Sequence, residues 1–162
     1  MVCDFVEKDS GSRLTIVNVH LASKRHQQSI FSPVEPGFDG KLDVRIEQAK
    51  LIKREAQKVL NQGNQYYITG DFNDSEYSRT LEALCAHGAV NLVLNLAETE
   101  RYDYNHRGKL QVLMHGIVSP ELANSGSAEY EIIHGNELIG VNPAQQSDKP
   151  SDHAYVIAKI SL

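Results

Sequence analysis

The stretch that decides the fold is YYITGDFNDSE, residues 66–76. A short apolar run ends at Gly70, and Asp71, Asn73 and Asp74 follow within four positions. Glycine followed by aspartate is typical of a turn or a helix cap. Carboxylate and amide groups at the end of a strand are also what a site for a metal ion and a phosphate needs. The stretch therefore predicts a strand that ends either in a turn or in such a site.

The composition predicts one globular domain that covers residues 1–162. Hydrophobic residues make up 41% of the chain and charged residues 23%, which is ordinary for a folded domain. No apolar run reaches the length of roughly 18 residues that a membrane span requires. The first residues, MVCDFVEKDSG, lack the basic start and the apolar centre of an export signal. We therefore expect neither a membrane span nor a signal peptide within this chain.

The net charge of −5 argues against a protein that coats nucleic acid through bulk positive charge. It leaves room for an enzyme that holds a single phosphodiester with a metal ion and a few local cations. Cys3 and Cys85 form no metal motif, so we expect two buried free thiols. A disulfide between them stays open as the alternative.

Hydrophobic periodicity predicts alternating strands and helices. Residues 1–7 and 13–21 read as a strand hairpin, and 43–61 as a helix with Asp43 as its N-cap and Gly63 as its terminator. Further strands are predicted at 65–70, 109–119, 128–135 and 151–162, with a short helix at 78–88. The alternation is only partial, which favours an α/β sandwich over a doubly wound parallel sheet. The apolar content of 14–21, 66–70 and 154–160 predicts strands buried on both faces.

Polar side chains that a core does not need stand at the ends of the predicted strands. They are Asn18 and His20, Asp71 and Asn73, and Asp152 and His153. Taken singly, a strand-end histidine is usually structural, Gly-Asp before a helix is usually a turn, and Ser-Asp before a strand is usually a loop. Their joint occurrence favours a common site, because strand ends can converge in one cleft.

Phosphoester hydrolysis uses these residue types. Mg²⁺ prefers carboxylate oxygens and water, and can polarise a phosphate oxygen. A carboxylate such as Asp71 can orient or deprotonate the attacking water, and an amide such as Asn73 can hold that water or a phosphate oxygen. Histidines such as His20 and His153 can donate hydrogen bonds to the reacting phosphate. Zinc is not favoured, because the cysteines are isolated and the histidines lack zinc spacing.

Four stretches together resemble a known family. NVHLASKR, YITGDFND, KLQVLMHGIVSPEL and PSDHAY resemble, in this order, the later motifs of the endonuclease/exonuclease/phosphatase superfamily, whose fold is DNase I-like. The likeness is greatest to bacterial extracellular nucleases and covers nearly all of the chain. It implies the C-terminal half of an α/β sandwich, with helices packed on a mixed or antiparallel sheet. It also implies Mg²⁺ (or Mn²⁺ or Ca²⁺) as cofactor, DNA or RNA as substrate, and a secreted or periplasmic parent protein.

The resemblance implies a role for each matching position. His20 and His153 would contact the scissile phosphate, Asp71 would activate water, and Asn73 would orient the phosphate. Asp71 and Asp152 would bind the metal. Further contacts to substrate phosphate are expected from Asn18, Lys24, Arg25 and Arg107.

The chain departs from the family pattern in two respects. The early Asn and the early Glu, the latter the family's main metal ligand, belong to segments expected before Met1. Met114 stands where the family has an aspartate that orients a catalytic histidine. His115 follows it but is expected to point to the opposite face of the strand. Both departures predict weak or absent activity for this chain alone.

Two further functions stay open. One is a phosphatase acting on a lipid or sugar phosphate, since the same core serves both reactions. The other is a non-catalytic fragment or pseudoenzyme that acts as an interaction module. A half sandwich should also expose the inner face of its sheet, so we expect a second copy or an N-terminal half to cover it.

Overall fold

The computed structural model describes residues 1–24, 39–106, 108–139 and 151–162. Arg25 and Arg107 lie outside the described residues. None of the described helices is long and apolar enough to cross a membrane. Cys3 and Cys85 are both free, as expected, although each is half-buried and not fully enclosed.

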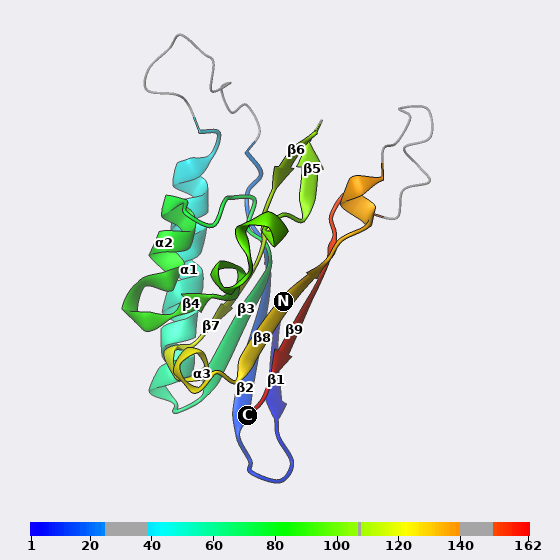
Figure 1. Cartoon of the computed structure of the whole chain (residues 1–162). Coiled ribbons are helices and arrows are strands. Elements are labelled where there is room, and N and C mark those ends of the chain that lie inside the picture. Colours follow the sequence, from blue (N-terminus) through cyan, green and yellow to red (C-terminus); the bar gives the residue numbers. More distant parts are fainter. Residues whose placement is uncertain (25–38, 107, 140–150) are drawn as a thin grey trace.

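A five-stranded mixed sheet forms the centre of the molecule (Figure 1). Its strand order is β1 (Val2–Val6), β2 (Arg13–His20), β3 (Gln65–Asp71), β7 (Met114–Val118) and β4 (Val90–Asn91). β2 and β3 run parallel, whereas β1 is antiparallel to β2, and β3 and β4 are antiparallel to β7. The predicted mixed sheet and the hairpin of the first two strands are confirmed.

Two helices cover one face of this sheet. α1 (Leu42–Asn61) and α2 (Arg79–Cys85) pack against β2, β3 and β7 through a core that includes Ala49, Ile68 and Phe72. The N-cap of α1 is Lys41, in a left-handed conformation, and Asp43 lies inside the first turn. The prediction of Asp43 as the N-cap was therefore wrong, although its negative charge still suits the positive end of the helix dipole. Gly63 follows the helix end with a positive φ, as predicted.

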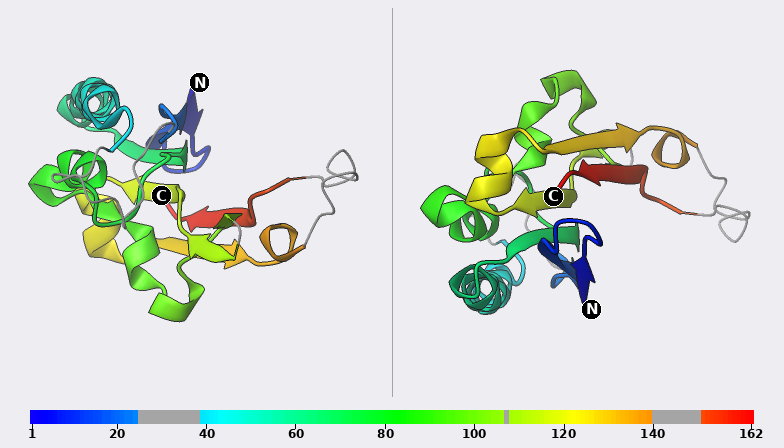
Figure 2. Two further views of the ribbon diagram at one scale, coloured as in Figure 1. Left: turned by 90° about the horizontal axis from the view of Figure 1, so that it is seen from above. Right: turned by 90° about the horizontal axis from the view of Figure 1, so that it is seen from below.

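A second, two-stranded sheet covers part of the other face. β8 (Ala128–Ile133) and β9 (Tyr155–Ile160) pair antiparallel and lie on the side of the main sheet away from α1 (Figure 2). At Gly116 a Cβ atom would come within 2.8 Å of Tyr130 and 2.9 Å of Tyr67, so glycine lets both rings lie over β7. The expectation of an open inner face is thus wrong over β3 and β7, because β8 and β9 cover it.

Short elements complete the fold. The hairpin of β5 (Tyr104–His106) and β6 (Lys109–Gln111) precedes β7, so the predicted strand 109–119 is broken at Val112 and Leu113. α3 (Pro120–Ser125) connects β7 to β8. Single 3₁₀ turns are η1 (Ala86–Gly88), η2 (Leu92–Asn95), η3 (Glu98–Glu100) and η4 (Asn136–Leu138).

Apolar side chains remain exposed along two strands. On β1, Val2, Phe5 and Val6 are 63%, 52% and 50% exposed, and on β9, Tyr155 and Ile157 are 60% and 53% exposed. β9 alternates between exposed and half-buried residues, so the prediction that it is buried on both faces was wrong. Both strands thus present apolar side chains to solvent.

Candidate active site

The carboxylate of Asp71 lies at the carboxyl ends of the parallel strands β2 and β3. Residue 71 pairs with His20 on β2 and with Met114 on β7. Gly70 makes this close approach possible: its φ is +129°, and a Cβ atom there would lie 2.0 Å from the carbonyl oxygen of Val19. The glycine of the GDFND stretch therefore has a steric reason, and the polar cluster after it is more than a turn.

Three polar groups surround Oδ2 of Asp71. His20 places Nε2 3.5 Å from this oxygen, and His153 places Nε2 3.9 Å from it. Asn73 donates Nδ2–H to the same oxygen at 3.1 Å, and its backbone N–H donates to Oδ1 at 2.7 Å. The structure thus brings together four residues that the sequence singled out: His20, Asp71, Asn73 and His153.

The electrostatics of Asp71 suit a proton acceptor. Burial raises the pKa of Asp71 above its ordinary value, although the N–H of Asn73 and the charges of His153 and His20 oppose this shift. Asn73 itself is fixed in place, because its Nδ2–H also donates to the carbonyl oxygen of Leu21 at 3.0 Å and its φ is +52°. Asparagine tolerates this left-handed conformation better than most residues.

Asp103 is a site residue that sequence reasoning missed. It is fully buried, and its Oδ2 lies 2.5 Å from Nδ1 of His153. Burial alone would lower the pKa of His153, but the hydrogen bond to Asp103 and the nearby carboxylates raise it above its ordinary value. The stretch ERYDYNHRGK carries Asp103 between two tyrosines, and no spacing rule connects it to a histidine fifty positions later.

Tyr104 and Asp152 border the same group. Tyr104 stacks on His153 with ring centroids 4.9 Å apart, and the two residues form an isolated β-bridge. Burial and the charges of Asp152 and Asp71 raise the pKa of the Tyr104 phenol. Asp152 is exposed. Asn18 is also exposed and lies two residues before His20 on β2, so the side chains of Asn18 and His20 point to the same face of the strand.

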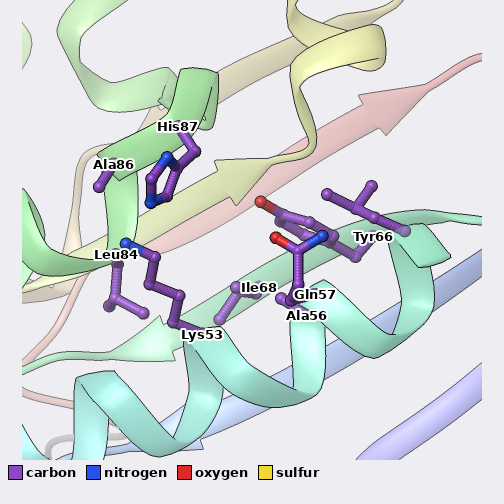
Figure 3. A pocket seen from close by; sticks show the side chains of 9 residues that line it. Lys53, Ala56, Gln57, Tyr66, Ile68, Leu84, Ala86 and His87 are labelled. Atoms are coloured by element: carbon purple, nitrogen blue, oxygen red, sulfur yellow. The ribbon is translucent and has the colours of Figure 1, made fainter.

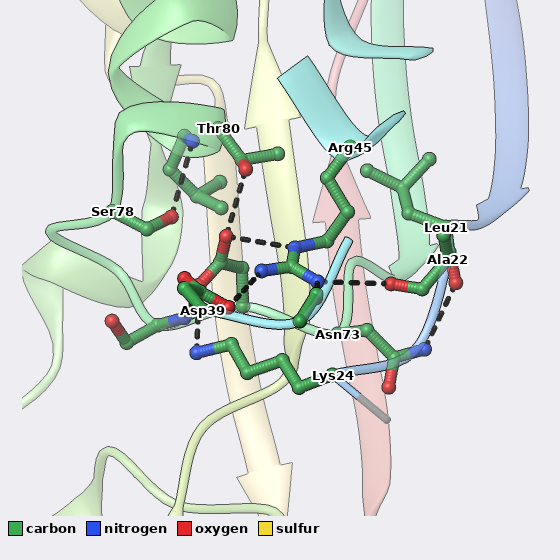
Figure 4. A network of polar contacts seen from close by, with 12 residues as sticks. Leu21, Ala22, Lys24, Asp39, Arg45, Asn73, Ser78 and Thr80 are labelled. Atoms are coloured by element: carbon green, nitrogen blue, oxygen red, sulfur yellow. Dashed lines mark hydrogen bonds and ion pairs between the residues drawn. The ribbon is translucent and has the colours of Figure 1, made fainter. Parts of the chain in front are cut away.

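Asp74, three residues beyond Asp71, belongs to a separate ion network (Figure 4). Its Oδ2 accepts hydrogen bonds from Nε of Arg45 at 3.1 Å and from the hydroxyl of Thr80 at 2.7 Å, and its Oδ1 lies 2.8 Å from Nζ of Lys24. Burial opposes ionisation, but Lys24, Thr80 and Arg45 together lower the pKa of Asp74. Arg45 is fully buried and also binds Asp39. Its contacts to two carboxylates inside the protein give it a structural role.

Lys24 therefore holds a buried carboxylate, and this contact occupies the ammonium group that the sequence analysis assigned to substrate phosphate. The assignments of Arg25 and Arg107 fall on residues outside the described ranges. Arg101, another local cation, donates to the carbonyl oxygens of Leu94 and Leu96. It holds the backbone together at this point.

His115 lies on the opposite face of β7 from the site, as the strand alternation predicted. It is completely buried, contacts Phe72 edge-on, and lies 2.9 Å through Nε2 from the carbonyl oxygen of Asp74. Its Nδ1 lies 3.0 Å from Nδ2 of Asn91, which can only donate, so Nδ1 accepts and Nε2 carries the proton. Burial lowers the pKa of His115 to about 4. It is a neutral structural histidine.

The carboxylate oxygens at the site are donor atoms of the type that a divalent cation such as Mg²⁺ prefers. Mg²⁺ takes one or two protein carboxylates together with water and substrate phosphate, and Asp71 and Asp152 are carboxylates near Tyr104. Over the described part of the chain, however, no group of three or more His, Cys, Asp or Glu side chains is arranged to hold a metal ion.

A small pocket, open to solvent, lies away from this site (Figure 3). It is formed between α1, α2 and β3 by residues that include Lys53, Tyr66, Ile68 and His87. Tyr66 and Ile68 point to the helix face of β3, whereas Asp71 points to the other face. The pocket and the polar cluster are therefore separated by the sheet.

Neither family models nor curated proteins match the chain. Solved structures do. The chain aligns over 99% of its length with 58% of a truncated Caenorhabditis elegans TDP2, at 14% identity and a TM-score of 0.64. It aligns over 98% with 55% of the Bacteroides thetaiotaomicron mannosyl-6-phosphatase Bt3783, at 19% identity and a TM-score of 0.60. A 3′-5′ exonuclease, NExo, from Neisseria meningitidis matches at 18% identity and a TM-score of 0.60, over 94% of this chain and 62% of that one.

The chain has the fold of the endonuclease/exonuclease/phosphatase structures. Two structures described as proteins of that family, from Bacteroides thetaiotaomicron and Bacteroides vulgatus, match 98% of the chain at 19% and 18% identity. The chain spans about half the length of the structures that it matches. The DNase I-like α/β architecture expected from the motifs is thus confirmed, and identities this low carry the fold alone.

Proposed function

We propose that this chain carries the water-activating and phosphate-binding part of a metal-dependent phosphodiesterase of nuclease type. The observation that supports the proposal is the convergence of His20, Asn73 and His153 on Oδ2 of Asp71. Ion-pair networks inside a fold do not need two imidazoles with their Nε2 atoms around one half-buried carboxylate. Phosphoester hydrolysis can use them, because it benefits from a proton acceptor beside hydrogen-bond donors for the phosphoryl oxygens.

In the proposed reaction, water attacks phosphorus, a new P–O bond forms, and the ester P–O bond on the opposite side breaks. The proton of the attacking water goes to Asp71, whose raised pKa makes it a better acceptor than an exposed aspartate. His153 and His20 donate Nε2–H to the phosphoryl oxygens, where negative charge increases in the transition state. Asn73 keeps the carboxylate in one orientation through its two N–H contacts.

Asp152 and Asp71 are the residues that would hold Mg²⁺, Mn²⁺ or Ca²⁺. Such a cation, when bound, polarises a phosphate oxygen and stabilises the charge on the leaving oxygen. The exposure of Asp152 leaves room for water and substrate phosphate as the remaining ligands.

We propose DNA or RNA as the substrate. The His20 side chain is 76% exposed at the carboxyl end of β2, where a long polymer can reach it. A sugar phosphate is the second candidate, favoured by the likeness to a structure named as a mannosyl-6-phosphatase. The two differ in the charge of the scissile group: a monoester carries a second ionisable oxygen that a diester lacks. Paired substrates can therefore separate them.

The exposed apolar strips of β1 and β9 need a cover in the working protein. We assign them to a polypeptide segment equivalent to the rest of the matched structures, because the chain spans only 58% and 55% of two of them. Size-exclusion chromatography with light scattering tests this assignment. A monomer at micromolar concentration that binds a hydrophobic dye agrees with it, whereas a stable dimer shows that a second copy is the cover.

Hydrolysis assays test the function itself. Plasmid DNA, bis-p-nitrophenyl phosphate and mannose 6-phosphate would be incubated with the chain and Mg²⁺ or Mn²⁺, beside an Asp71→Ala/His153→Ala double variant. Lys159→Ala, an exposed position on β9, is the matched control. Cation-dependent cleavage that the double variant loses and the control keeps supports the proposal, and the preferred substrate decides between diester and monoester.

Equal rates for the chain and the double variant would contradict a working site in this chain. The motifs would then be inherited architecture, and the non-catalytic interaction module would replace the enzyme as the interpretation.

A further inference from the structure

The carboxylate that contacts Nδ1 of His153 comes from an unexpected position. In the sequence pattern, residue 114 is where a histidine-orienting aspartate is expected, and this chain has methionine there. A thioether cannot accept a charge-assisted hydrogen bond from an imidazole. Asp103, in the segment before β5, instead places Oδ2 2.5 Å from Nδ1 of His153.

We propose that Asp103 positions His153 for hydrolysis, in the place of the aspartate that residue 114 lacks. The inference rests on the proposed function, because His153 needs orienting only if its Nε2 faces the reacting phosphate. It assigns a role to a residue that the family motifs did not mark. It also removes one of the two sequence arguments against activity, the methionine at position 114.

The contacts of Asp103 explain how its carboxylate can replace one carried by residue 114. Its Oδ1 accepts the backbone N–H groups of Leu113 at 2.6 Å and of Met114 at 2.9 Å. The Asp103 carboxylate therefore lies against the backbone of residue 114. Met114 pairs with Asp71 across β3 and β7, and directly paired residues point to the same face of a sheet. An aspartate side chain starting at residue 114 would thus begin beside the atoms where that of Asp103 ends.

Asp103 is rigidly held. Its backbone N–H donates to the carbonyl oxygen of Gln111 at 2.9 Å, and its own carbonyl accepts from the N–H of Ala154 at 2.7 Å, next to His153. The residue is 0% exposed, and among the described residues no lysine or arginine forms an ion pair with it. His153 is therefore its one side-chain partner in that part of the chain, and a buried carboxylate needs such a partner.

A purely structural role for Asp103 would be to hold the backbone at residues 113 and 114. That role uses Oδ1 alone and would survive in Asp103→Asn, whose amide oxygen can still accept both N–H groups. The positioning role uses Oδ2, which becomes an N–H₂ donor facing Nδ1 of His153. The ring would keep its Nε2–H donor, but the charge-assisted hydrogen bond at Nδ1 that fixes its orientation would be replaced by a weaker one to a neutral amide.

The test compares the unmodified chain with Asp103→Asn, Asp103→Ser and the exchange variant Asp103→Ser/Met114→Asp. We expect Asp103→Asn to lower kcat on bis-p-nitrophenyl phosphate by about 10- to 10²-fold with little change in KM, because His153 loses the carboxylate that orients it. The exchange variant should recover most of the activity that Asp103→Ser loses, because the carboxylate returns from position 114. Urea unfolding of each variant reports whether it is folded.

A second readout does not depend on activity. The ¹⁵N signals of the His153 imidazole, assigned by their loss in His153→Gln, report which ring nitrogen carries hydrogen. They should change in Asp103→Asn and return toward the original pattern in the exchange variant. If the chain hydrolyses none of the substrates, the proposed function fails, and these signals still decide whether Asp103 orients the ring.

Two results would overturn the inference. One is an Asp103→Asn variant with unchanged kcat and unchanged imidazole signals. The other is a folded exchange variant that recovers neither activity nor signals relative to Asp103→Ser, since the carboxylate at residue 114 would then be no substitute for Asp103.

Discussion

Asp71 and Asp74 are three residues apart in one motif, and the fold gives them opposite environments. Burial raises the pKa of Asp71, which is surrounded by an amide and two imidazoles. Asp74 is only 1% exposed, yet its pKa is lowered because Lys24, Thr80 and Arg45 together outweigh the burial. Asp71 is thus easier to protonate than an exposed aspartate, and Asp74 is held as an anion inside the protein. Acid and base assignments in enzymes often follow from such divergent pairs.

The difference shows that a motif does not assign roles to its members. Asp71 ends a strand on the face toward β8 and β9, while the chain then turns through Asn73 and carries Asp74 to the helix face, beside Arg45. Asp71 and Asp74 are at the same strand end because they are close in sequence. They have different partners because their side chains point to opposite faces of the sheet.

The largest expected effect is on catalysis at Asp71. Asp71→Asn should lower phosphodiester hydrolysis by about 10²- to 10⁴-fold, because an amide cannot accept the proton of the attacking water. Its stability in urea should be unchanged or slightly higher, since burial disfavours the charged form that is removed. Full activity in Asp71→Asn would show that Asp71 does not accept the proton of the attacking water, and its contrast with Asp74 would then have no catalytic meaning.

Asp74 should show the reverse pattern. Asp74→Asn leaves Arg45 buried with the half-buried Asp39 as its remaining carboxylate partner, which should cost about 2–4 kcal/mol of unfolding free energy. Urea unfolding followed by circular dichroism measures it. An Asp74→Asn variant as stable as the original chain would show that the ion network carries no net stability.

The free energy of unfolding should decrease as the pH falls, because of the buried His115, whose Nε2 lies 2.9 Å from the carbonyl oxygen of Asp74. Its pKa is about 4 in the folded chain against an ordinary 6.5, so the unfolded chain binds more protons between these values. Stability is therefore lost as the pH falls from 6.5 to 4, by up to about 1.4 kcal/mol per pH unit. Urea unfolding at pH 7, 6 and 5 measures the slope, and His115→Gln should flatten it while the exposed His106→Gln should not.

Gly70 sets the approach of β3 to β2 that places Asp71 beside His20. Gly70→Ala should destabilise the fold by about 1–3 kcal/mol and lower activity, because its Cβ would meet the Val19 carbonyl oxygen. Gly63→Ala is the matched control: its φ is also positive, at +75°, but nothing lies within 4 Å. Equal losses of stability at both positions would show that the positive φ of Gly70, and not the contact with Val19, accounts for the effect.

The smallest expected effect is at Lys24. Lys24→Gln removes one of two cations on Asp74 and should cost about 1 kcal/mol in urea unfolding, with KM for DNA unchanged within about twofold. A large rise in KM would instead mean that Lys24 leaves Asp74 for the substrate, as the sequence pattern suggested.

The sequence predicted much of the fold, and it singled out four residues that the structure brings together but not Asp103. The helix over 42–61, the first hairpin and the strand ending at Asp71 follow from hydrophobic periodicity and glycine positions. It did not predict that β9 exposes one face, because Tyr155 and Ile157 are apolar whether or not a partner covers them. It also assigned Lys24 to a ligand, because sequence alone does not show that Asp74 turns toward it.

What the sequence determined by itself is the set of reactive groups: histidine, aspartate and asparagine at strand ends, in an order that resembles one superfamily. What only the tertiary structure decided is which carboxylate serves which histidine. Asp103 and His153 are fifty positions apart and meet because backbone hydrogen bonds to Gln111 and Ala154 hold Asp103 between them. A contact of this kind depends on the packing of three separate segments, and no local spacing in the chain encodes it.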